Sequence, residues 1–194
     1  GALAYAGAPS IGASTFTGAK PTAASNATVS AQVGAGASLK ATGAASPVSV
    51  EAYSSNRATA KADTLSIGIG NAMGESIAAS EANGSTTAAL AGSVSDSSGL
   101  TVRAKALNLA DSDADAPGGG LGGTQSGGSS TANANGAVNA YVGDSAAASV
   151  LTSDTSVTVE ALSTADADAR AYGLSVGMAA VGIMKATATV SPDV

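Results

Sequence analysis

Three aspartates at alternate positions, Asp111, Asp113 and Asp115, are the residues whose type and spacing come nearest to metal-binding chemistry. Carboxylates at positions 1, 3 and 5 begin a calcium-binding loop, which also needs a glycine at position 6 and a bidentate glutamate at position 12. The chain has Ala116 and Gly122 at those two places, so the calcium loop is incomplete. We expect the aspartates to face solvent on a strand, where outward charge discourages edge-to-edge association.

Nucleophilic catalysis lacks its usual partners, because the chain has no histidine and no cysteine. A Ser-His-Asp triad, a thiolate metal site and disulfides are therefore excluded. Serines are abundant, but none is expected in a nucleophile elbow at a strand-to-helix junction. Gly118, Gly119 and Gly120 lack the Gly-Lys-Ser/Thr that completes a phosphate loop. We predict that the protein is not an enzyme and uses no cofactor.

The net charge and the hydrophobic pattern also limit the classes of partner that the protein can have. Lys and Arg number 8 and Asp and Glu 14, a net charge of −6 over 194 residues. This is the wrong sign for a phosphate-binding surface, so we expect no nucleic-acid partner. The most apolar stretch, residues 172–184, contains three glycines and is shorter than the roughly 20 residues of a membrane-spanning helix. We expect a core strand there and no membrane insertion.

Internal repetition is the strongest pattern in the chain. Residues 48–52 (VSVEA), 100–104 (LTVRA) and 157–161 (VTVEA) share a motif at spacings of 52 and 57 residues. Ten residues after each motif begins, an alternating alanine segment starts, at 58–62, 110–114 and 167–171. An apolar third segment follows at 65–69 and 174–178, whereas the middle copy has PGGGLGG at 117–123 and a glycine-serine run to residue 130. We interpret residues 117–130 as a loop insertion or a locally loosened strand.

The segments predict strands rather than helices. Each alternates apolar and polar residues at period 2, as a half-buried strand does. Helix is the alternative, because 47 residues are alanine, the best helix former. We reject it because valine and isoleucine recur at i, i+2 and glycine interrupts nearly every dozen residues.

The predicted fold is all-β: a β-solenoid of stacked strand repeats of about 52–57 residues, since one unit cannot bury its apolar face alone. Residues 1–194 then form a single array, with a partial unit at 1–47, units at 48–99 and 100–156, the second carrying the insertion 117–130, and a partial unit at 157–194. A β-sandwich is the alternative fold. The pattern leaves open whether one repeat is one wide turn or two narrow ones. Small inward residues predict sheets closer than the usual ~10 Å, and Gly84, Gly99 and Gly143 are expected to supply positive φ in turns.

Two further sets of side chains are candidates for surface contacts. Tyr53, Tyr141 and Tyr172 lie near expected strand ends, where we favour capping of a thin core over stacking on a sugar. Five cations occupy the polar face beside acidic neighbours and are expected to be solvent-facing gatekeepers: Arg57, Lys61, Arg103, Lys105 and Arg170.

The order of the segments resembles the repeat arrays of very large Gram-negative surface proteins. VxVxA is followed by AxAxA, an LSVGM-type apolar strand, ATATV, and AYVGD before the next VxVxA. This resembles the filamentous-haemagglutinin-like, leukotoxin-type filamentous adhesins that are secreted by a two-partner pathway. The resemblance covers nearly the whole chain except 117–130, and it implies an elongated β-rich shaft outside the outer membrane. It carries over no functional residue.

From this resemblance we expect a structural shaft segment of a secreted adhesin, located outside the cell or on its outer surface, with roles in cell adhesion and biofilms. Its expected partners are neighbouring repeats of a longer chain and a host or matrix surface. The alternative is a self-assembling extracellular filament or sheath subunit, in which identical subunits join through strand edges.

Overall fold

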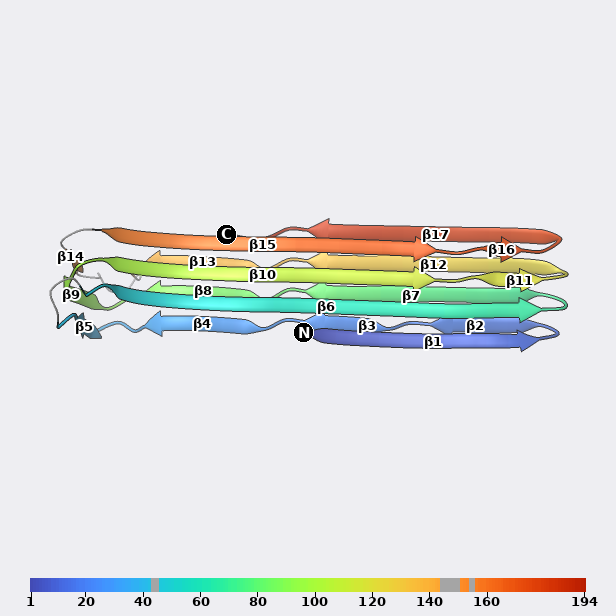
Figure 1. Ribbon diagram of the computed structural model, residues 1–194, viewed down its shortest axis with the longest axis horizontal. Helices are drawn as coiled ribbons and strands as arrows, with labels where there is room; N and C mark the ends of the chain where they lie inside the picture. The colour runs from blue at the N-terminus through green and yellow to red at the C-terminus, as the bar shows by residue number, and fades with distance from the viewer. Residues whose placement is uncertain (43–45, 144–150, 154–155) are drawn as a thin grey trace.

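The computed structural model describes residues 1–42, 46–143, 151–153 and 156–194, with only the backbone described at 151–153. These residues form seventeen β-strands, and every pairing between named strands is parallel. The predicted all-β solenoid is confirmed (Figure 1). None of the described residues belongs to a helix long and apolar enough to cross a membrane.

The strands follow one another in four coils. The first coil holds β1 (Ala2–Gly12), β2 (Thr15–Ala19), β3 (Thr22–Ser25), β4 (Thr28–Val33) and β5 (Ser38–Lys40). The second holds β6 (Val48–Gly68), β7 (Ala72–Ala82), β8 (Ser85–Leu90) and β9 (Ser93–Ser97). The third holds β10 (Leu100–Asp115), β11 (Gly118–Gly120), β12 (Gly123–Ala134), β13 (Ala137–Val142) and β14 (Leu151–Ser153). The fourth holds β15 (Val157–Tyr172), β16 (Ser175–Val176) and β17 (Ala179–Val190).

Equivalent strands of successive coils lie side by side and form four sheets. The long sheet contains β1, β6, β10 and β15 together with β11 and β16, and the facing sheet contains β2, β3, β7, β12 and β17. A short sheet of β4, β8 and β13 continues beyond the facing sheet, and β5, β9 and β14 form the fourth sheet. Figure 1 shows the coils stacked with their long strands nearly perpendicular to the direction of stacking.

The register of the ladders matches the sequence repeat. Leu100 pairs with Val48 on one side and Val157 on the other, and Ala110 pairs with Ala58 and Ala167. One repeat of 52–57 residues is therefore one wide coil. The sandwich alternative is wrong, because a β-sandwich is built from antiparallel sheets with hairpin and Greek-key connections.

The glycine-serine stretch 117–130 is not an insertion. Gly118 pairs with Ser66 and Ser175 in the long sheet, and Thr124 pairs with Ala72 and Ala180 in the facing sheet. The expectation of an inserted loop is wrong, and the strand alternative describes this segment. Glycine has low strand propensity, but here the backbone is held by ladders to coils on both sides.

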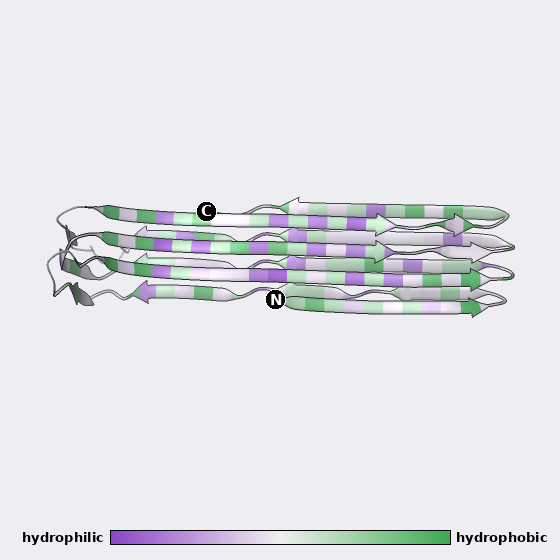
Figure 2. Ribbon diagram, in the orientation of Figure 1, coloured by the Kyte–Doolittle hydropathy of each residue, from purple (hydrophilic) through white to green (hydrophobic). Residues whose placement is uncertain are grey.

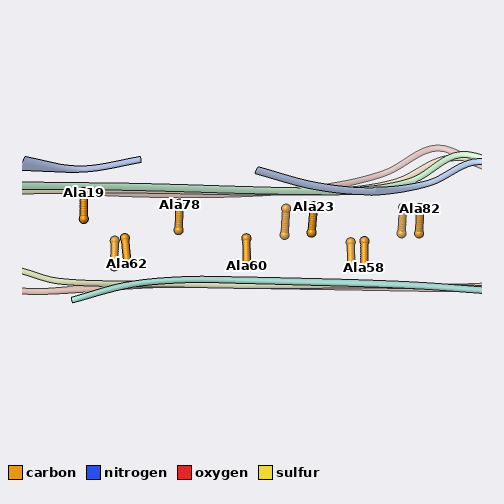
Figure 3. Close-up of a cluster of buried hydrophobic side chains, with 11 residues drawn as sticks. Ala19, Ala23, Ala58, Ala60, Ala62, Ala78 and Ala82 are labelled. Carbon is orange, nitrogen blue, oxygen red and sulfur yellow. The ribbon is translucent and has the colours of Figure 1, made fainter. Parts of the chain in front are cut away.

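The space between the long and facing sheets is filled by small side chains, in which a cluster of alanines, here called the alanine layer, is accompanied by buried serines and threonines. Ala58, Ala60 and Ala62 of β6 point toward Ala78 and Ala82 of β7, and all five are at most 1% exposed (Figure 3).

The hydroxyl of Ser130, on β12 of the facing sheet, donates to the carbonyl oxygen of Ser112, on β10 of the long sheet, at 2.7 Å. A side chain as short as serine can reach the opposite backbone only if the sheets lie unusually close.

The interior changes along the coil, because larger aliphatic side chains fill the part under the short sheet. The cluster there includes Val50, Leu90, Leu100, Val102 and Val138, all at most 7% exposed. A polar pair separates this cluster from the alanine layer.

In the polar pair, Asn56 and Asn108 are fully buried, and the Asn56 amide nitrogen donates to the Asn108 side-chain oxygen at 2.9 Å. The backbone N–H of Ala27 donates to the Asn56 oxygen at 3.1 Å. Buried amides need such partners, so the pair holds neighbouring coils in register.

Glycines at the turn after the facing sheet make room for these asparagines. A Cβ on Gly84 would lie 1.9 Å from the Asn56 amide nitrogen, and a Cβ on Gly136 would lie 2.3 Å from that of Asn108. Of the three glycines expected to have positive φ, only Gly143 does, at +94°. Gly84 is required for close approach and not for an unusual backbone angle.

Leucine substitution tests how closely the sheets approach. Ala78→Leu places extra methyl groups between the sheets and is expected to lower the free energy of unfolding by roughly 1–3 kcal/mol. Ala79 is the adjacent residue and faces outward, so Ala79→Leu should change it by less than about 0.5 kcal/mol. Urea denaturation followed by far-UV circular dichroism measures both variants. Equal effects would contradict a thin interior.

Candidate interaction surface

The outer face of the long sheet carries a charged band in which neighbouring coils pair opposite charges. Arg103 lies in register between Glu51 and Glu160. Its Nε donates to Glu160 Oε2 at 2.6 Å, and its Nη1 lies 4.0 Å from Glu51 Oε1. The bond to Glu160 raises the pKa of the Arg103 guanidinium above its ordinary value, and a bond to Tyr53 adds to this. The column therefore favours one register of three coils.

The three candidate aspartates lie on this band, at successive outward positions of β10. Outward neighbours on one strand are about 7 Å apart, which is too far for three carboxylates to share one ion at 2.3–2.6 Å. Among the described residues, no three His, Cys, Asp or Glu side chains are grouped so that they could hold a metal ion. Asp111, Asp113 and Asp115 therefore lie on one face of the sheet, but their carboxylates do not converge on a single ion position.

Each aspartate has different neighbours across the ladder. Asp113 pairs in register with Lys61 and Arg170, two cations.

Asp115 pairs instead with Asp63 and Tyr172. Partial burial raises the pKa of the Asp115 carboxyl above its ordinary value, repulsion from Asp113 and Asp63 adds to this, and Lys61 opposes it.

The five cations face outward, as expected from their positions in the pattern: Arg57, Lys61, Arg103, Lys105 and Arg170. Arg170 pairs with Asp168, and Lys61 Nζ lies 3.7 Å from Asp63 Oδ1. They belong to the same ladders as the acids and do not form a separate basic patch.

The tyrosines do not cap the interior, contrary to expectation. Tyr53, Tyr141 and Tyr172 are between 45% and 60% exposed on outward-facing positions. The Tyr53 hydroxyl donates to Glu51 Oε2 at 2.8 Å, which ties the ring to the charged band. These half-exposed rings lie on the outer surface of the strands, and none of them is part of the alanine layer.

A serine in a Gly-x-Ser-x-Gly sequence, Ser175, was not singled out by the sequence reasoning. Its Oγ lies 2.6 Å from Ser126 Oγ and donates to the Val181 carbonyl oxygen at 2.9 Å. These contacts join β16 to β12 and β17, and the chain has no histidine to act as the base of Ser175. The hydroxyl therefore contributes to packing and is not arranged as a nucleophile.

The outer faces offer ion pairs and hydrogen bonds between neighbouring coils and an exposed surface for contact with other molecules. The larger hollows among the described residues are open grooves on those faces, and two of them are floored by Gly119 and Gly127. No family model, curated protein or solved structure matches this chain.

The crowded carboxyl of Asp115 gives a pH-dependent prediction. Because its pKa is raised in the folded state, stability present at low pH is lost as the pH rises through the folded-state pKa. Asp115→Asn removes this penalty, so the variant should be more stable than the parent at pH 7 by about 0.5 kcal/mol. The gain should vanish below about pH 3, where the Asp115 carboxyl is protonated in both the folded and the unfolded parent chain.

Asp113→Asn is the matched control: it relieves the repulsion on Asp115 but also removes the attraction to Lys61 and Arg170, so its gain should be smaller than that of Asp115→Asn. Urea denaturation at pH 7 and pH 3 measures all three proteins. An equal gain in both variants at pH 7 would contradict the role given to the partial burial and crowding of the Asp115 carboxyl.

Proposed function

We propose that this chain is a structural segment of the shaft of a large secreted bacterial adhesin, without catalysis. The observation that carries the proposal is the difference between inward and outward columns of the ladders. Most inward columns keep the same or a similarly small residue, as in Ala58, Ala110 and Ala167 or in Ala60, Ser112 and Ala169. The positions that repeat in this chain are therefore the inward ones, through which one coil packs on the next.

Outward columns change from coil to coil. Tyr53 is followed by Lys105 and Leu162, and Glu51 by Arg103. A periodic binding array, such as one that matches a crystalline or polymeric ligand, would repeat its outward chemistry in every coil. The variation favours a stacking role, with any affinity carried by particular places on the surface.

Stacking produces length at constant width. Each coil adds one strand layer, about 4.8 Å, to the long and facing sheets, and the parallel ladders continue without a break from the first to the fourth coil of the facing sheet. A shaft needs this property, because a longer array is made by adding coils. The resemblance to filamentous-haemagglutinin-like adhesins supports a location on the outer surface or in the medium.

The second candidate is a self-assembling filament or sheath subunit, which one observation favours. Among the described strands, β1 pairs only with β6, β15 only with β10, and β17 only with β12. These strands therefore leave one row of backbone donors and acceptors open at each end of the stack. Another copy could pair there through strand edges.

The size of the native polypeptide separates the two candidates. Antibody raised against these residues is used to probe surface and medium fractions of the organism that carries the sequence, with cytoplasmic fractions as the control. A surface or medium band of many hundreds of kilodaltons is the expected result. A band near 18 kDa would contradict the shaft and favour the subunit, and a band confined to the cytoplasm would contradict both.

A further inference from the structure

One end of every coil is apolar on its outside. We define the apolar edge as the place where the long sheet turns into the facing sheet, with Ile11, Ile67, Ile69, Leu121, Val176 and Met178 as its main residues. Ile69 is 73% exposed, Leu121 71% and Met178 92%. Figure 2 shows hydrophobic residues toward this end of the long strands and hydrophilic ones along their middle.

The apolar edge is also uncharged in all four coils. Residues 8–19, 64–74, 116–134 and 173–184 contain no Asp, Glu, Lys or Arg. The net charge of −6 is therefore carried elsewhere on the chain. Two copies can meet at this edge without bringing like charges together.

The edge is large enough for a specific interface. The six apolar side chains of the edge are between 40% and 92% exposed. At roughly 150 Å² for a fully exposed large apolar residue, they present on the order of 600 Å². A standard interface covers about 800 Å² per partner, of which somewhat more than half is non-polar, so the edge supplies the apolar share of such an interface.

The third coil adds a groove to this edge. In the outward column of the long sheet, Gly119 pairs with Ile67 and Val176, so two large side chains flank a position without one. A Cβ on Gly119 would meet nothing within 4 Å. The resulting hollow of about 540 Å³ is lined by apolar residues and glycines. It can accept one aliphatic side chain from a partner.

We propose that two copies of this chain pair through the apolar edge in antiparallel orientation, about a twofold axis perpendicular to the stack of coils. A twofold axis makes the same patch serve both copies, so the patch must complement itself. The second coil of one copy then meets the third coil of the other. Ile67 faces the Gly119 groove, and Ile69 faces Leu121.

The turn residues also complement each other in this orientation. Ala13 occupies the first turn and Met178 the fourth, and the antiparallel pair sets the small side chain against the large one. A parallel pair would set Met178 against Met178 and Ala13 against Ala13, which leaves a collision at one end and a gap at the other. Pairing through this edge goes beyond the proposed function, since it applies to a shaft and to a subunit alike.

Sedimentation velocity over a concentration series tests the pairing. The parent chain should show a dimer that dissociates on dilution and does not grow further. Ile69→Glu with Leu121→Glu places two carboxylates in the interface and should weaken dimerisation at least 100-fold, with an unchanged far-UV circular dichroism spectrum. Ser49→Glu with Thr101→Glu is the matched control: it adds the same two charges at paired outward positions of the long sheet, far from the edge, and should leave the dimer intact.

Cross-linking tests the orientation, since the chain has no cysteine of its own. One batch carries Ala13→Cys and another Met178→Cys, and the batches are oxidised separately and as a mixture. The mixture should form a disulfide-linked dimer faster than either batch alone. Faster self-linking of the Met178→Cys batch would overturn the antiparallel arrangement.

Three other results would overturn the proposal itself. They are a parent chain that is monomeric at every concentration, open-ended growth that the paired glutamates do not affect, and flotation of the chain with phosphatidylcholine vesicles in place of self-association. The first leaves the shaft untouched, the second indicates joining through strand edges, and the third indicates a lipid occupant. None depends on the size of the native polypeptide, so failure here is distinct from failure of the proposed function.

Discussion

The close approach of the long and facing sheets is the constraint on which the rest of the structure depends. It requires small side chains at most inward positions, and the alanine layer with its buried serines and threonines supplies them. A layer this thin contributes little apolar burial per residue, so the parallel backbone ladders must carry much of the specificity of stacking. The same constraint couples distant residues: Asn56 and Asn108 stand opposite Gly84 and Gly136, whereas the fourth coil has alanine and proline at the corresponding positions.

Because most inward columns keep the same or a similarly small residue, most differences between coils are on the outside. The charged band along the middle of the long strands fixes register through opposite charges, as in the column of Glu51, Arg103 and Glu160. The edge where the sheets meet lacks charge and presents aliphatic side chains. The interior serves to stack the coils, and the outer surface is divided into a charged band and an apolar edge. This arrangement suits an extended support that contacts other molecules only along the band or the edge.

The repeat spacing and the period-2 pattern were enough to predict the strands and the stacking, since both follow from side-chain alternation and from the need of each unit for a neighbour. The outward positions of Asp111, Asp113 and Asp115 followed from the same alternation. The sequence could not decide between a loop and a strand at Gly118, because local propensity ignores the ladders on either side. The sequence also left open whether one repeat forms one wide coil or two narrow ones, since this depends on where the chain reverses direction. The exposure of Tyr172 was missed because a tyrosine is equally compatible with either face of a strand.

Engineered disulfides test the in-register parallel ladder most directly, because the chain has no cysteine to interfere. Ser49 and Thr101 are register partners on the outer face of the long sheet, at a separation that a disulfide can span. Oxidation of the Ser49→Cys, Thr101→Cys variant should close the bond, detected by mass spectrometry of the digest. Glu51 is displaced by two residues, about 7–8 Å from the same partner, so Glu51→Cys with Thr101→Cys should stay reduced. Closure of the displaced pair in preference to the first would contradict the stacked coil.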